Sequence, residues 1–177
     1  MGAADAAPYL HQHPKHKTLF YAGLTDADGY LTYELGLEAD NAAQNFVERC
    51  AELADTVILD LSGQRIDAFL PGALIHADNV IALFTPDVQG ICWHGSVKPL
   101  FAAMSAQERV LPVAAMANRY CDLAAAEKAA DTHFAITLPY VHEFRREGTS
   151  DGTTFVAMQY LREVKKLHAL LKGADGK

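Results

Sequence analysis

The chain has 177 residues and a formal net charge of −7, and 50% of its residues are hydrophobic while 21% are charged. This length fits one domain with a single core, and the composition excludes a disordered chain. The negative charge argues against broad electrostatic binding to nucleic acid or anionic lipid, so we expect no specific nucleic-acid partner. No apolar run approaches the roughly 20 residues that span a bilayer.

The N-terminal stretch and the cysteines indicate the cellular compartment. MGAADAAPYLHQHPKHK (1–17) lacks the charged-then-apolar order of a signal peptide. The three cysteines, Cys50, Cys92 and Cys121, are odd in number and widely spaced, which favours neither a disulfide framework nor a zinc site. A reducing, cytoplasmic location is the expectation.

The first half of the chain alternates apolar runs with helical patterns. Residues 17–24 predict a strand before an Asp- and Gly-rich turn. A helix is expected from residue 40 or 41, and TVILDL (56–61) predicts a fully apolar strand. Residues 66–77 predict a short helix that is broken or kinked near Pro71-Gly72.

The second half continues this alternation as far as the last predicted helix. The predicted strands are 79–86, 109–117 and 133–140, and the predicted helices are roughly 94–106, 122–130 and 153–171. Strands that are apolar on both faces and separated by helices indicate a parallel sheet covered on both sides. The predicted fold is therefore α/β, with a mostly parallel sheet of about five strands and helices on both faces.

The predicted domain organisation is simple. Residues 17–172 are expected to form one α/β domain, with a flexible segment at 1–16 and a flexible tail at 173–177. In such sheets ligands bind beyond the carboxyl ends of the strands. The candidate site segments are therefore Asp60 to Gln64, Thr85 to Gly90, Asn118 to Tyr120, and Pro139 to Glu147.

The stretch TVILDLSGQ (56–64) places an aspartate where a strand is predicted to end and a glycine three positions later. An ionised Asp60 there can hold a magnesium-bound water, and Gly63 lets a backbone amide approach a phosphate. The alternative is structural: Asp60 is a carboxylate that caps the loop or the next helix.

Four segments in register resemble the ParA/MinD family of deviant P-loop ATPases, over roughly residues 18–172. They are TVILDLSGQ, ALIHADNVIALFTPD, VLPVAAMANRY and FAITLPYVHEF. The resemblance implies that Asp60 opens a switch loop and that Asn118 hydrogen-bonds adenine. It also implies that Pro139 and Tyr140 lie near the base.

The sequence departs from that family at the phosphate loop. It contains no G-x-x-x-x-G-K-[ST] motif, and Lys17-Thr18 lacks the glycines and precedes a predicted strand rather than a helix. The groups that neutralise a transferring phosphoryl are therefore missing from the sequence. The family includes pilus-assembly and polar-localisation proteins, resembling TadZ or CpaE, in which the phosphate loop can be atypical.

The resulting hypothesis is a non-hydrolysing ParA/MinD-like organiser or adaptor that acts through protein contacts, as a homodimer or with a protein partner. Its setting would be spatial positioning, or pilus or secretion assembly. At most, weak ATP or ADP binding and a vestigial magnesium site at Asp60 are expected. One alternative is the C-terminal part of an active ATPase that was truncated at the N-terminus. Another is an unrelated α/β enzyme that binds a small molecule.

Two further clusters contain residues that could carry chemistry. HQHPKH (11–16) brings three histidines together but no acid, so we expect a solvated segment rather than a metal site. In GICWHGS (90–96) the spacing of Cys92 and His94 makes direct nucleophile–base pairing awkward. Trp93 is expected to pack against the following helix or against a partner.

Overall fold

The computed structural model describes residues 6–23, 39–62, 67–142 and 158–174. Its contacts divide the chain into two compact units, Met1–His76 (unit 1) and Ala77–Lys177 (unit 2). Each unit is described by itself below. The single domain expected over residues 17–172 therefore stays a prediction.

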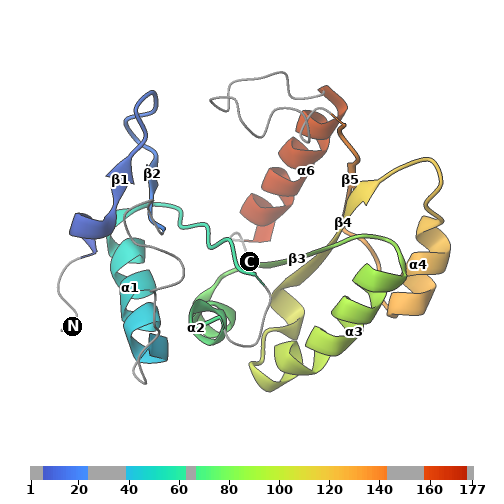
Figure 1. Ribbon diagram of the computed structural model, residues 1–177, viewed down its shortest axis with the longest axis horizontal. Coiled ribbons are helices and arrows are strands. Elements are labelled where there is room, and N and C mark those ends of the chain that lie inside the picture. The colour runs from blue at the N-terminus through green and yellow to red at the C-terminus, as the bar shows by residue number, and fades with distance from the viewer. Residues whose placement is uncertain (1–5, 24–38, 63–66, 143–157, 175–177) are drawn as a thin grey trace, which may run out of the picture. The chain divides into compact units, whose positions relative to one another are not determined.

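Unit 1 begins with a small hairpin and continues with helices (Figure 1). Strand β1 (His11–Gln12) pairs antiparallel with β2 (Phe20–Tyr21) and follows the 3₁₀ helix η1 (Ala7–Tyr9). Strand β2 lies inside the strand predicted over 17–24, but its partner is β1 rather than a parallel neighbour. Strand β1 itself lies in the segment that was expected to be flexible.

Helix α1 (Ala39–Leu53) confirms the helix predicted from residue 40 or 41. Its Phe46 ring meets the Phe69 ring of α2 edge-on, with centroids 6.3 Å apart, and meets Tyr9 of η1 in the same way. Such edge-to-face pairs add to the free energy of apolar burial. These aromatic contacts join η1, α1 and α2.

Helix α2 (Phe69–His76) runs without a break through Pro71 and Gly72, so the predicted break there is wrong. Pro71 lies in the first turn of the helix. Backbone N–H groups in a first turn have no intrahelical acceptor, so a proline there removes no helix hydrogen bond.

The strand predicted over 56–61 is also wrong. Residues 56–62 have no assigned secondary structure, and Ile58 is 87% exposed. An apolar run forms a buried strand only where a neighbouring strand supplies hydrogen-bond partners for its backbone. In the described part of unit 1 the only strand pairing is that of β1 with β2, and residues 56–62 pair with neither strand.

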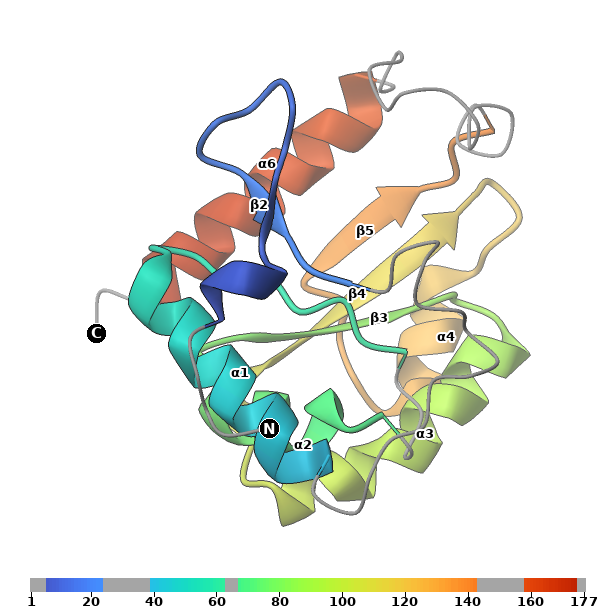
Figure 2. The ribbon, with the colours of Figure 1, turned by 60° about the vertical axis from the view of Figure 1, so that its left-hand side comes forward.

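Unit 2 contains a three-stranded parallel sheet in the order β3-β4-β5 (Figure 2). Its strands are β3 (Val80–Phe84), β4 (Val110–Ala117) and β5 (Ile136–Pro139), all within the predicted ranges. Helix α3 (Val88–Ala103) joins β3 to β4, with a short 3₁₀ turn, η3 (Gln107–Arg109), before β4. Helix α4 (Leu123–Ala130) joins β4 to β5. The α/β class is thereby confirmed.

The sheet of unit 2 has helices on both faces, as predicted. Successive right-handed crossovers in one direction place α3 and α4 on the same face, and α6 (Met158–Ala174) lies on the other (Figure 1). The core between α6 and the sheet consists of Val113, Ile136, Leu138 and Leu167. The predicted start of this helix, at residue 153, lies outside the described residues.

Helix α3 begins six residues before its predicted start at 94, since its first residue is Val88. None of the described helices is long and apolar enough to cross a bilayer.

Candidate functional site

The three parallel strands of unit 2 end at the same edge of the sheet, which we call the carboxyl edge. There β3 is followed by Thr85 to Asp87, β4 by Asn118 to Tyr120, and β5 by Tyr140. This is where α/β sheets bind ligands, because the loops leaving neighbouring strands meet there.

Three predicted site residues come together at this edge. Ala117, the last residue of β4, pairs with Pro139 at the end of β5, and the Tyr140 N–H donates to the Ala117 carbonyl at 2.8 Å. Asn118 follows Ala117 directly, so its backbone adjoins that of Pro139 and Tyr140. Asn118 and Tyr140 are both exposed to solvent. The adenine contact expected of all three stays a prediction.

A bulge in β4 sets the direction of the chain just before Asn118. The register with β5 shifts between Ala114 and Ala117. Within that interval Met116 has φ 55°, in the left-handed region, and is 56% exposed. Such a conformation is unusual for a long side chain, and bulges next to binding sites commonly redirect the side chains that follow. Sequence reasoning missed this feature because methionine carries no turn signal.

The loop after β4 is organised by Asn118. Its Oδ1 accepts from the Tyr120 N–H at 2.9 Å, and its carbonyl oxygen accepts from the Cys121 N–H at 3.1 Å. This is an Asx-type turn, in which the side chain replaces a backbone acceptor. The carboxamide oxygen retains a second lone pair through which it can accept a hydrogen bond from a ligand.

Arg119 and Tyr120 form an exposed pair on the same loop. The Arg119 guanidinium carbon lies 4.7 Å from the centroid of the Tyr120 ring, and Arg119 donates a hydrogen bond to the Tyr120 hydroxyl. Tyr120 is 80% exposed. The pair presents a cation and an aromatic face to solvent at the carboxyl edge.

Asp87 caps the N-terminus of α3. Its Oδ1 accepts from the Gly90 N–H and from the Thr85 hydroxyl, each at 2.9 Å. The Gly90 N–H first, and then the Thr85 hydroxyl, hold the pKa of this carboxyl below its ordinary value. The group is therefore charged at neutral pH.

Gly90 is required by the close approach of the strand that precedes α3. A Cβ at this position would lie 2.0 Å from the carbonyl oxygen of Thr85, a distance that no side chain can occupy. The glycine therefore allows α3 to begin directly against the end of β3, which places the cap at the carboxyl edge.

Helix α4, like α3, begins with a capping aspartate. Asp122 accepts from the Ala125 N–H at 3.0 Å and caps this helix, which lies in the predicted range 122–130. A helix N-terminus with open N–H groups is a natural phosphate site. At both helices of this edge a carboxylate already accepts from one of these N–H groups.

Asp60 belongs to unit 1 and is exposed, in the stretch without secondary structure. Asn118, Pro139 and Tyr140 belong to unit 2, so the position of Asp60 relative to them is not determined. Gly63 lies outside the described residues. Asp60 as a magnesium ligand therefore stays a prediction.

The capping role considered for Asp60 is filled by Asp67. Its Oδ2 accepts from the backbone N–H and the hydroxyl of Ser62, at 3.2 and 3.1 Å, and its Oδ1 accepts from the Phe69 N–H at 3.1 Å. Asp67 therefore joins the end of the TVILDLS stretch to the start of α2.

The described residues contain no group of three or more His, Cys, Asp or Glu side chains that could hold a metal ion. Within HQHPKH the His13 and His16 rings lie 4.9 Å apart, while the His11 ring packs 5.6 Å from Tyr21. The three histidines are thus not gathered around one point.

The Cys92-Trp93-His94 run lies within α3, where Cys92 is exposed and His94 is 3% exposed. Trp93 is half-buried and packs 6.2 Å from Phe84, so it contacts the preceding strand rather than a following helix. This arrangement does not join the thiol to the imidazole as nucleophile and base.

Comparison with known proteins supports the fold. No family model matches the chain, and no curated protein matches it. Among solved structures, the chain is similar to a ParA family ATPase from Chlorobium tepidum TLS, with a TM-score of 0.60 and 16% sequence identity. The match covers 95% of this chain and 64% of that one. The chain thus has a ParA-like α/β fold and spans less than two thirds of the length of that ATPase.

Proposed function

We propose that this protein is a non-hydrolysing organiser or adaptor with a ParA-like fold, which acts through protein contacts. Its setting would be spatial positioning, or pilus or secretion assembly. The observation that carries the proposal is the carboxylate on the N-terminus of each helix at the carboxyl edge, Asp87 on α3 and Asp122 on α4.

These carboxylates act against phosphoryl transfer. Catalysis of that reaction depends on positive groups and open N–H donors that stabilise charge on the transferring phosphoryl. At the described carboxyl edge the two helix N-termini instead carry negative charge, which would repel a polyphosphate.

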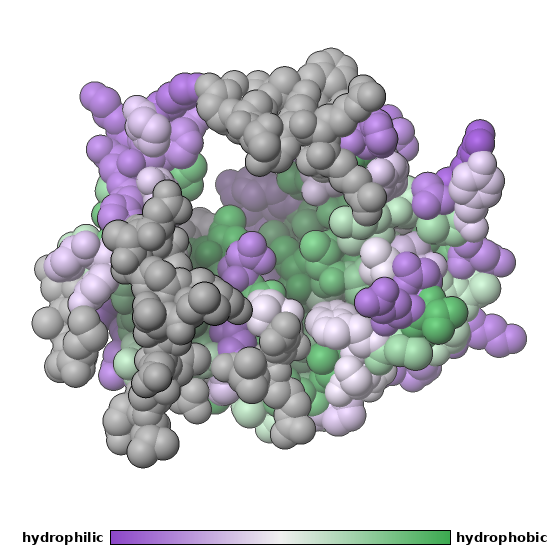
Figure 3. Space-filling view, in the orientation of Figure 1, coloured by the Kyte–Doolittle hydropathy of each residue, from purple (hydrophilic) through white to green (hydrophobic). Residues whose placement is uncertain are grey.

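Two surfaces of unit 2 support protein contacts. The first is the exposed Arg119–Tyr120 pair, since arginine and tyrosine are enriched among the residues that dominate interface energies. The second is the α6 side of β3, where Ile81 and Leu83 are 42% and 52% exposed. Figure 3 shows hydrophobic residues at the surface over this sheet.

The open side of β3 follows from the register. Leu83 pairs with Val113, which α6 covers, so both side chains point to the same face of the sheet. Parallel sheets are ordinarily covered on both faces. A protein partner or a second copy of this chain would cover Ile81 and Leu83.

The repulsion of phosphate by Asp87 and Asp122 can be tested with variants that keep the helix caps. Asparagine caps a helix about as well as aspartate, so Asp87→Asn with Asp122→Asn neutralises the edge while the caps remain. We expect ADP binding by this double variant to strengthen about threefold to tenfold over wild type, measured by calorimetry.

The matched control is Asp78→Asn, which neutralises an exposed aspartate two residues before β3, at the edge of the sheet opposite the carboxyl edge. This variant should bind ADP no better than wild type. Equal ADP affinity in the wild type and the double variant would show that these carboxylates do not exclude phosphate.

A second candidate is that the chain is part of an active ATPase whose phosphate loop lies outside it. The adjacency of Asn118, Pro139 and Tyr140 favours it, because these residues would then form the base site. Saturable binding of adenosine that Asn118→Ala abolishes would support this candidate, while absence of adenosine binding would favour the adaptor.

A further inference from the structure

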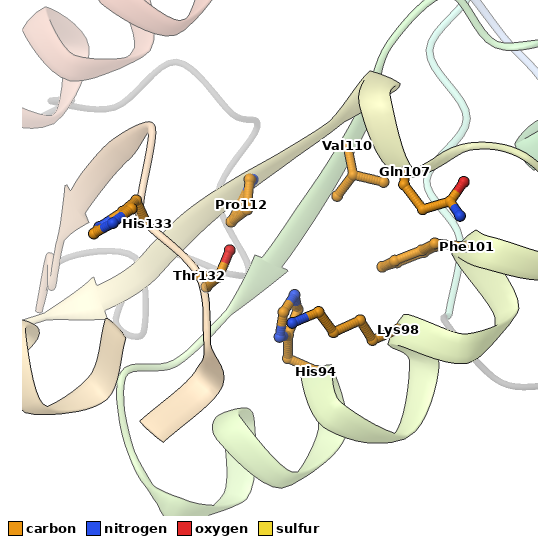
Figure 4. A pocket seen from close by; sticks show the side chains of 8 residues that line it. All are labelled: His94, Lys98, Phe101, Gln107, Val110, Pro112, Thr132 and His133. Carbon is orange, nitrogen blue, oxygen red and sulfur yellow. The ribbon is translucent and has the colours of Figure 1, made fainter. Parts of the chain in front are cut away.

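A groove lies at the edge of the unit 2 sheet that is opposite the carboxyl edge. It is formed beside the start of β4 and the chain segment that leads into β5. Its volume is about 230 Å³. Phe101, Val110 and Pro112 form an apolar part of its lining, and His94, Lys98 and Thr132 contribute polar groups. Figure 4 shows His94 and Lys98 side by side on α3, facing the start of β4 and the chain that leads into β5.

His94 has an unsatisfied polar atom. The residue is 3% exposed, and its Nδ1 is buried without a hydrogen-bond partner. The ring stacks on Phe84, with centroids 4.6 Å apart and planes at 19°, and this contact fixes its orientation. A buried polar atom that has lost water without gaining a partner is destabilising, so its presence calls for an explanation.

The residues that line the groove include one cation, Lys98, and the imidazoles of His94 and His133. The carboxylates nearest to them, Asp131 beside Lys98 and Glu127 beside His133, are not part of the lining. This contrasts with the net charge of −7 of the whole chain. A cation and hydrogen-bonding groups beside an apolar surface match an anion that carries an apolar body.

Lys98 can exchange its present partner. Its Nζ donates to the Asp131 carboxylate at 2.8 Å and to the Asp131 carbonyl at 2.9 Å. The Asp131 side chain is 94% exposed, so the ion pair is weakened by water and salt. A second carboxylate can therefore replace it on Lys98, or share the ammonium with it, at small cost.

We propose that this groove is a binding site for a small organic carboxylate. The carboxylate lies beside the His94 ring and the Lys98 Nζ, and the apolar body packs on Phe101, Val110 and Pro112. The groove is smaller than the roughly 300–1,000 Å³ of sites for drug-sized molecules, which limits the ligand to a small acid.

The pKa of His94 reports on the binding of a carboxylate in the groove. Burial, and then the charge of Lys98, lower the pKa of this imidazole. The other titratable group of the lining, His133, has a 95% exposed side chain that lies 3.6 Å from the Glu127 carboxylate. A bound carboxylate next to His94 favours its charged form and therefore raises its pKa.

This inference does not rest on the proposed function. The groove lies at the edge of the sheet opposite the carboxyl edge, and none of its residues takes part in the helix caps there. A failure of carboxylate binding would leave the adaptor proposal unchanged, and the reverse also holds.

The test uses benzoate and isobutyrate as probes and benzamide as the uncharged control, with the histidine rings of the full chain observed by NMR. We expect both acids to bind saturably, to shift the His94 signals and to raise the pKa of His94. Benzamide should bind at least about tenfold more weakly than benzoate, because it lacks the charge that Lys98 pairs with.

Three variants decide the assignment. Lys98→Met and His94→Phe should each weaken benzoate binding about tenfold or more. His168→Gln, at an exposed position on α6, should leave benzoate binding unchanged. Lys98 is exposed, so its variant tests the site even where His94→Phe disturbs the fold. The proposal is overturned if neither acid binds, if benzamide binds as well as benzoate, or if Lys98→Met binds benzoate like wild type.

Discussion

At the scale of single residues, two glycines of one helix have opposite requirements. Gly90 begins α3 against the carbonyl oxygen of Thr85, 2.0 Å from where a Cβ would lie, whereas Gly95 has no atom within 4 Å of such a Cβ. The same substitution at the two positions therefore separates a steric requirement from simple helix propensity.

We expect Gly90→Ala to destabilise the protein by about 1–3 kcal/mol or more, because the backbone of Thr85 has to move. Gly95→Ala should leave stability unchanged or raise it by up to about 1 kcal/mol, since alanine loses less conformational entropy in a helix. Urea unfolding of both variants is the measurement. Equal effects of the two substitutions would contradict the described start of α3.

His94 gives a residue-level prediction on pH. Its pKa is lowered from 6.5 in the folded chain, so the unfolded chain takes up the proton first as the pH falls. The free energy of unfolding should then decrease below about pH 6.5, with a slope of at most about 1.4 kcal/mol per pH unit for this group. Above pH 6.5 the contribution of His94 is fully present.

The variant His94→Phe keeps an aromatic ring against Phe84 and should reduce this slope, as measured by urea unfolding between pH 7 and pH 5. Asp87, Asp131 and Glu163 do not interfere, because their lowered pKa values lie below the ordinary 3.8 to 4.5 of such groups. A slope that is the same in His94→Phe and wild type would show that His94 is not the group responsible.

At the scale of elements, α6 is held to the sheet by one stripe of side chains. Leu167 is 9% exposed and belongs to the core with Val113, Ile136 and Leu138, while Leu170, one turn further on, is 46% exposed. The two leucines are neighbours on the helix surface and differ in burial, so they separate core packing from partial contact.

Leu167→Ala should cost about 2–5 kcal/mol of stability, because it removes a buried side chain and leaves a cavity against β4 and β5. Leu170→Ala should cost less than about 1 kcal/mol. Thermal and urea unfolding give both values. Similar losses for the two variants would mean that α6 does not pack on the sheet through the Leu167 side.

At the scale of the whole molecule, the sequence predicted unit 2 better than unit 1. The runs at β3, β4 and β5 are apolar and alternate with helices, and each strand finds a parallel neighbour. The equally apolar run at 56–61 finds no strand partner in the described residues, and Ile58 is left exposed. Apolar composition predicts burial, but pairing depends on which strands lie alongside.

The sequence predicted only those parts of the candidate site that follow directly from strand order. Asn118, Pro139 and Tyr140 could be placed at one edge because they follow strands that proved to be parallel neighbours. The Met116 bulge and the cap by Asp87 depend on local backbone geometry, and the groove at His94 depends on packing between α3 and β4. None of these leaves a periodic signal in the sequence.

We propose that this protein, with its ParA-like fold, works without nucleotide hydrolysis. The most direct test of this proposal is calorimetric titration of the full chain with ATP and magnesium, followed by a phosphate-release assay on the same sample. We predict no tight binding of magnesium-ATP and no phosphate release above the level without protein. Tight binding with steady phosphate release, lost in Asp60→Asn, would contradict the claim and restore Asp60 as part of a working switch.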